Sequence, residues 1–145
     1  MNDSPHTPTT TKKTHRLRGV LEEKTQDKVV VSIPETNYRL HLATLNEVAT
    51  EIGNRIVGTI RLKAAKRFDV VKSGGRYIEP LYGQPRRIQG DIVDVDTANN
   101  TITVNAAAPI VVTVNEVQKA TDFEVGQFVA GDVMSNATFS PAPTP

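Results

Sequence analysis

Two stretches of this chain, residues 16–71 and 87–139, match each other as two copies of one small unit. The openings align at a spacing of 71 residues, with Arg16-Leu17-Arg18-Gly19 against Arg87-Ile88-Gln89-Gly90. The later parts align at a spacing of 73, with residues 52–60 against 125–133. Both alignments keep glycines and the apolar positions around them. Because an internal repeat indicates one structural unit used twice, it constrains the fold more than any other feature.

Within each copy, apolar residues recur at every second position. Val29, Val31 and Ile33 form one such series, and Tyr38, Leu40 and Leu42 form the next. This alternation predicts antiparallel strands with one buried face and one solvated face. The break at residues 34–37 is typical of a turn, since Pro fixes φ and Asn tolerates positive φ. In the second copy, residues 96–100 form the matching turn.

Five short strands in each copy predict a small barrel, because closure hides the edges of a short sheet. Later strands are expected over residues 55–63 and 128–135, each after a tight turn at Gly53 or Gly126. Helical turns could precede them at residues 45–51 and 117–122. Gly58 and Gly131, in matched mid-strand positions, would allow a sharp bend. The predicted fold class is all-β, with two tandem five-stranded barrels of either the oligonucleotide-binding (OB) or the SH3-like type.

The composition along the chain predicts five segments. Residues 1–14 and 140–145 are predicted disordered tails, the second of them Pro-rich. The first barrel unit spans 15–72, a linker spans 73–86, and the second unit spans 87–139. Gly74-Gly75 makes the start of the linker flexible, whereas its later tyrosines and leucine are too apolar for a free linker. Without a bilayer-length apolar run or a secretory signal, we expect a soluble cytoplasmic protein with no membrane contact.

Charge divides the chain at the start of the second copy. Residues 1–86 hold fifteen Lys and Arg against nine Asp and Glu, a net charge of +6, whereas residues 87–145 hold two against seven, a net charge of −5. One interpretation is that the first unit faces an anionic partner. The other is that a basic face of one unit docks on an acidic face of the other, within one molecule or between molecules.

The end of the first copy resembles part of a known family. Ile52-Gly53 leads through Ile60-Arg61-Leu62 to Lys63-Ala64-Ala65, which is similar to the Mop or TOBE type of OB-like domain, where a strand ends near a Lys-Ala-Ser triplet. The resemblance implies a barrel and, in tandem form, binding of molybdate. Ala65 stands where the family has a hydroxyl, and the second copy has Met134-Ser135-Asn136 at this point. Molybdate-type oxyanion binding therefore ranks last among the functions considered.

Basic and aromatic side chains form the candidate binding surface. Arg61 and Lys63 lie two residues apart on one strand face, as do Arg16 and Arg18. Cations that contact phosphates and rings that stack on bases are the components of a groove for single-stranded nucleic acid. An alternative for the tyrosines is packing between barrels. The predicted nucleic-acid-binding residues are Arg16, Arg18, Arg61, Lys63, Lys66, Arg67, Arg76, Tyr77, Tyr82, Arg86 and Arg87.

Other chemistry finds no support in the sequence. The chain has no cysteine, and His6, His15 and His41 lack metal-ligand spacing. We expect an acidic sheet edge that keeps the protein soluble, formed by Asp91, Asp94 and Asp96. No nucleophile elbow or phosphate loop is present. We therefore predict a protein that is not an enzyme and has no metal or cofactor.

The primary hypothesis is a binding module for RNA or single-stranded DNA that uses the basic first unit and the linker. The alternative is a protein interaction or self-assembly module with complementary basic and acidic faces.

Overall fold

The structure is a computed structural model that describes residues 15–72 and 74–142. It confirms the all-β prediction: twelve strands form one sheet, and a 3₁₀ turn, η2 (Ala120–Asp122), precedes β11. Side chains alternate as expected along β2 (Lys28–Ser32), where Val29 and Val31 are buried and Lys28 is exposed. The predicted tail at 1–14 and the last three residues of the tail predicted at 140–145 lie outside the described residues.

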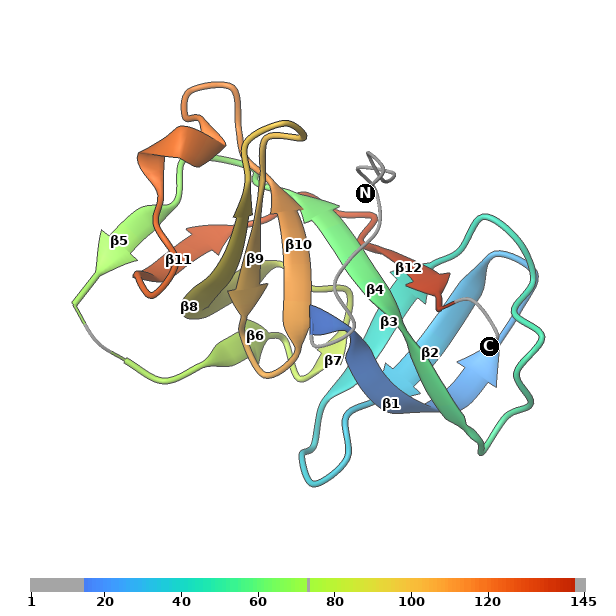
Figure 1. Cartoon of the computed structure of the whole chain (residues 1–145). Helices are drawn as coiled ribbons and strands as arrows, with labels where there is room; N and C mark the ends of the chain where they lie inside the picture. The colour runs from blue at the N-terminus through green and yellow to red at the C-terminus, as the bar shows by residue number, and fades with distance from the viewer. Residues whose placement is uncertain (1–14, 73, 143–145) are drawn as a thin grey trace, which may run out of the picture.

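Five strands close into a barrel at one end of the molecule (Figure 1). The order around the barrel is β1 (Leu17–Lys24), β2, β3 (Arg39–Ala43), β12 (Thr138–Pro141), β4 (Arg55–Lys63) and back to β1. All neighbours are antiparallel except β3 and β12. Because β12 comes from the far end of the chain, the second copy completes the barrel of the first.

The strands of the second copy form a neighbouring group. β8 (Arg87–Asp96), β9 (Thr101–Asn105) and β10 (Pro109–Thr113) make a meander, and β11 (Phe128–Asp132) pairs with the other edge of β8. The second half of β4 pairs in parallel with β10, so this one long strand runs through both groups (Figure 1).

Pairing between the two groups is therefore continuous. An isolated bridge joins Ala64, just after β4, to Val133, just after β11. Short β5 (Asp69–Val71) also belongs to the first copy by sequence, yet it pairs with β11. The boundaries expected from the sequence thus do not separate two sheets, and the division into units 15–72 and 87–139 stays a prediction.

Matched positions of the two copies make the same backbone contacts. The strand pairing shifts register just after Leu21 in β1 and just after Ile92 in β8. The N–H of Gly53 donates to the carbonyl of Leu21 (2.7 Å), and the N–H of Gly126 donates to that of Ile92 (2.8 Å). Both glycines have positive φ, 95° and 99°, as a tight turn requires. The turns predicted at these glycines are confirmed.

Two buried phenylalanines each belong to one copy and pack against a glycine of the other copy. Phe139 of β12 lies over Gly58 of β4, and Phe68, which follows β4, lies over Gly131 of β11. Each ring is 2% exposed, and a Cβ at either glycine would overlap the ring. The glycines predicted to permit a bend thus make room for an aromatic side chain. Each copy supplies a ring to the core of the other.

The segment between the copies is part of the sheet. β6 (Tyr77–Glu79) pairs with β8, and β7 (Tyr82–Gly83) pairs in parallel with β3. Ile78 is 2% exposed, and its N–H donates to the hydroxyl of Tyr38 (3.1 Å). The predicted linker is therefore a pair of short strands, one in each group.

Three local expectations need correction. Ser140 and Pro141 lie in β12 and not in a tail, since the backbone of β12 pairs with β4. Residues 45–51 contain no helical turn in the described chain, whereas η2 occupies the matching segment. In the turn at residues 34–37, positive φ falls on Glu35 (67°) and not on Asn37.

Candidate nucleic-acid interface

Arg61 and Lys63 line one groove where the two groups of strands meet. Along β4, Ile60 and Leu62 are buried, so the alternation directs Arg61 and Lys63 to the opposite, outer face. The groove has a volume of about 460 Å³. Its lining residues are Arg61, Leu62, Lys63, Thr113, Met134, Ser135, Asn136 and Thr138. Two cations, three hydroxyls and an amide contribute to this lining beside the apolar Leu62 and Met134, and we call it the junction groove.

Sequence reasoning found the cations of the junction groove but missed its other side. Ser135 and Asn136 come from the second copy, and the N–H of Met134 donates to the carbonyl of Lys63 (2.8 Å). The N–H of Ala65 donates to the carbonyl of Asp132 (2.9 Å), so residues 63–65 run antiparallel beside residues 132–134, and Ser135 and Asn136 follow directly. This contact between the two copies was not visible in the sequence.

Arg16 and Arg18 line a different hollow of about 320 Å³ with His15, Val93, Asn105 and Pro109. Arg18 lies opposite Val57 of β4, four residues before Arg61. The two predicted basic pairs therefore lie on neighbouring strands, with Arg61 and Lys63 on β4 and Arg18 beside β4 on β1.

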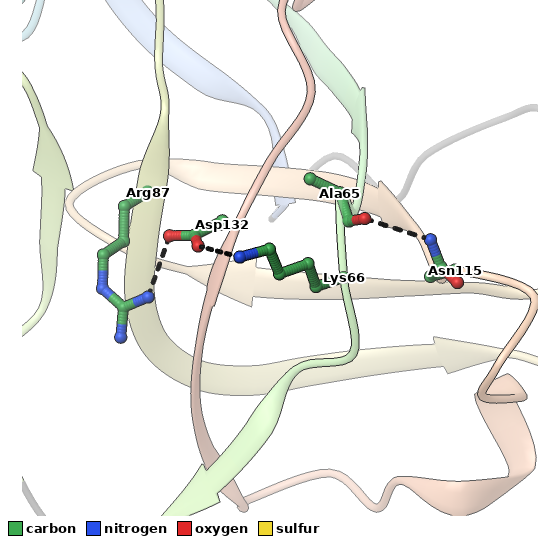
Figure 2. Close-up of polar contacts among 5 residues, drawn as sticks. All are labelled: Ala65, Lys66, Arg87, Asn115 and Asp132. Atoms are coloured by element: carbon green, nitrogen blue, oxygen red, sulfur yellow. Dashed lines mark hydrogen bonds and ion pairs between the residues drawn. The ribbon is translucent and has the colours of Figure 1, made fainter.

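Asp132 binds two of the predicted cations (Figure 2). Its carboxylate accepts a hydrogen bond from Arg87 (3.0 Å) and forms an ion pair with Lys66 (4.0 Å). Beside this cluster, the amide of Asn115 donates to the carbonyl of Ala65 (3.3 Å). Lys66 and Arg87 are therefore partly neutralised.

Arg76 is also paired with an acidic side chain. Its Nε donates to Asp91 at 2.6 Å, and this hydrogen bond, with the charge of Asp91, raises the pKa of Arg76 above its ordinary value. Together with Lys66 and Asp132, this pair joins the basic part of the chain to the acidic part within one molecule. Arg67 and Arg86 are exposed.

The two predicted tyrosines have different environments. Tyr77 is half-buried on β6, and its hydroxyl accepts a hydrogen bond from Arg87 (3.4 Å). This bond and the one to Asp132 raise the pKa of Arg87 above its ordinary value. Tyr82 is 59% exposed, and the guanidinium of Arg39 lies 5.5 Å from its ring centroid. Arg39 was not predicted, because only the pairing of β7 with β3 brings it to the ring.

A further hollow of about 280 Å³ lies on the outer face of β2 and β3. We call it the β2–β3 hollow; its lining residues are Glu23, Lys24, Thr25, Lys28, Val29, Val30, His41, Leu42, Ala43, Gln84 and Asn136. Lys24 has a structural role there, since its Nζ donates to the carbonyls of Val48 (2.9 Å) and Thr50 (3.0 Å). Asn136 lines both this hollow and the junction groove.

Neither a protein-family model nor a curated protein matches this chain. Across residues 15–72 and 74–142, no group of three or more His, Asp or Glu side chains is placed to hold a metal ion. His6 lies outside this range. The same residues include no helix with the length and apolar character needed to cross a membrane.

Proposed function

We propose that this protein binds RNA or single-stranded DNA, without catalysing a reaction on it, and that the junction groove is the phosphate-contacting site. The observation that supports this most is the joint lining of the groove by Arg61, Lys63 and the donors Ser135, Asn136 and Thr138. Cations neutralise phosphates and release counterions, while hydroxyl and amide donors bond phosphate oxygens and position the strand.

The barrel type agrees with this proposal. The barrel is closed and five-stranded, and the position of β12 between β3 and β4 supports our assignment of it to the OB-like type. OB folds bind oligonucleotides on the face of their second and third strands. The β2–β3 hollow lies on that face and shares Asn136 with the junction groove. A bound strand would therefore contact both.

Reversal of the two groove charges tests the proposal. The double variant Arg61→Glu/Lys63→Glu should lose binding to a fluorescent single-stranded oligonucleotide at moderate salt. For the wild type, log affinity should fall linearly with log salt concentration, with a slope that reports the number of phosphates contacted. Fluorescence anisotropy at several salt concentrations measures both quantities.

Arg55→Glu/Lys72→Glu is the matched control, because it reverses one exposed arginine and one exposed lysine outside both the junction groove and the β2–β3 hollow. We expect this control to retain most of the affinity. Equal loss in both double variants would mean that net charge alone attracts the oligonucleotide, and no binding by the wild type would refute the proposal.

Oxyanion binding is the second candidate, and one observation favours it. Lys63 of the first copy and Ser135 of the second line the same groove, so the second copy places a hydroxyl beside Lys63, whereas Ala65 of the first copy has none. A cation beside a hydroxyl donor suits a tetrahedral oxyanion. Stoichiometric uptake of molybdate in equilibrium dialysis, abolished by Ser135→Ala, would support this candidate over nucleic acid.

A further inference from the structure

We infer that Tyr82 and Arg39 form a base-stacking platform at one end of the nucleic-acid path, with a base stacked on the tyrosine ring. This inference rests on the proposed function and adds to it a site for the base, as distinct from the phosphate.

The platform is built by strand pairing between distant parts of the chain. Tyr82 on β7 lies directly beside Arg39 on β3, and the N–H of Arg39 donates to the carbonyl of Leu81 (2.8 Å). The guanidinium lies 5.5 Å from the ring centroid, within the range of a cation–π interaction. The ring is therefore held in a fixed place by the sheet and by a cation.

Exposure distinguishes Tyr82 from a packing residue. A tyrosine that stabilises a core is largely buried, whereas Tyr82 is 59% exposed and its neighbour Leu81 is 50% exposed. An exposed, pre-positioned ring with an adjacent arginine is the arrangement on which single-stranded nucleic acids stack their bases. The unfavourable free energy of exposing this apolar ring to water is offset when a base stacks on the ring.

The platform is continuous with the junction groove. Gln84, two residues after Tyr82, lines the β2–β3 hollow, and so does His41, which lies on the same outer face of β3 as Arg39. Asn136 then connects this hollow to the groove that Arg61 and Lys63 line. Residues two apart on a strand are separated by roughly 6.6 Å. A nucleotide chain can therefore extend from the Tyr82 ring through the β2–β3 hollow to Arg61 and Lys63.

Substitutions of Tyr82 test the inference with a single-stranded oligonucleotide that carries 2-aminopurine, a base whose fluorescence is quenched on stacking. Tyr82→Phe keeps the ring and should bind as the wild type does. Tyr82→Leu keeps the bulk without the ring and should weaken binding roughly 5- to 150-fold, the effect of losing one stacked base. The salt dependence of Tyr82→Leu should match that of the wild type, because no phosphate contact is removed.

Leu81→Ala is the control for general apolar contact and should leave the affinity unchanged. The inference is wrong if Tyr82→Leu binds like the wild type, or if Leu81→Ala weakens binding as much as Tyr82→Leu does. If Arg61→Glu/Lys63→Glu still abolishes binding in that case, the proposed function stands without the stacking platform. If the wild type binds no oligonucleotide, both fail. Circular dichroism and thermal unfolding of each variant show whether a loss of affinity follows from a loss of fold.

Discussion

The two copies pack alike but differ in charge. Phe139 over Gly58 and Phe68 over Gly131 are matched contacts. In contrast, Arg61 and Lys63 of the first copy correspond to Met134 and Asn136 of the second at the spacing of 73 residues. These four residues, two from each copy, all line the junction groove. A close-packed interior tolerates few changes of volume, whereas exposed positions are free to diverge, so the copies keep their buried contacts and differ in charge at positions that line the groove.

The largest effect is expected from removal of either crossing ring. Phe139→Ala and Phe68→Ala should each lower the free energy of unfolding by about 3–5 kcal/mol, because a fully buried ring leaves a cavity. Since each ring belongs to one copy and packs in the other, both substitutions should shift a single cooperative transition in urea. Two separate transitions, with only one of them shifted, would show that the copies fold independently. Phe128→Ala, at a half-buried position of β11, provides the milder comparison.

Substitution of the glycines under the rings sharpens the same comparison. A methyl group at Gly58 or Gly131 would overlap Phe139 or Phe68, so Gly→Ala should cost about 1–3 kcal/mol at either site. Gly75→Ala is the control, since nothing lies within 4 Å of a Cβ there, and a surface change of this kind stays within about 0.5 kcal/mol. Urea unfolding of the three variants measures the difference. Equal midpoints would contradict the packing described.

The smallest effect on stability is expected at the charge cluster. Asp132→Asn removes the partner of Lys66 and Arg87, which are 77% and 38% exposed at their side chains, so stability should fall by less than about 1 kcal/mol. Freed of that carboxylate, the two cations lie near the junction groove. If nucleic acid binds there, affinity at low salt should rise and its salt dependence should steepen.

Glu116→Gln removes an exposed carboxylate of the same acidic half and is the matched control for Asp132→Asn. It should change neither the affinity nor the slope. An increase of the same size in both variants would mean that only the net charge of the protein matters, and no increase in either would place the bound strand away from Asp132.

Much of the local structure followed from the sequence alone. The alternation of apolar residues predicted the strands, including the full extent of β4 at residues 55–63. The glycine signals predicted the turns at Gly53 and Gly126, and the two-residue spacing predicted that Arg61 and Lys63 share a groove. Each of these depends on neighbours within a few residues, which periodicity and turn chemistry can read.

The partners of the strands could not be predicted in the same way. The pairing of β12 with β3, of β10 with β4 and of β7 with β3 joins residues that are far apart in sequence, and hydrophobic alternation fits any partner of similar length. That pairing brings Ser135 to Lys63, Asp132 to Lys66 and Arg39 to Tyr82. The period-two pattern was enough to indicate which residues face outward. Which of them meet depends on how the strands pair and close into the barrel, because contact across a sheet joins residues that are far apart in the chain.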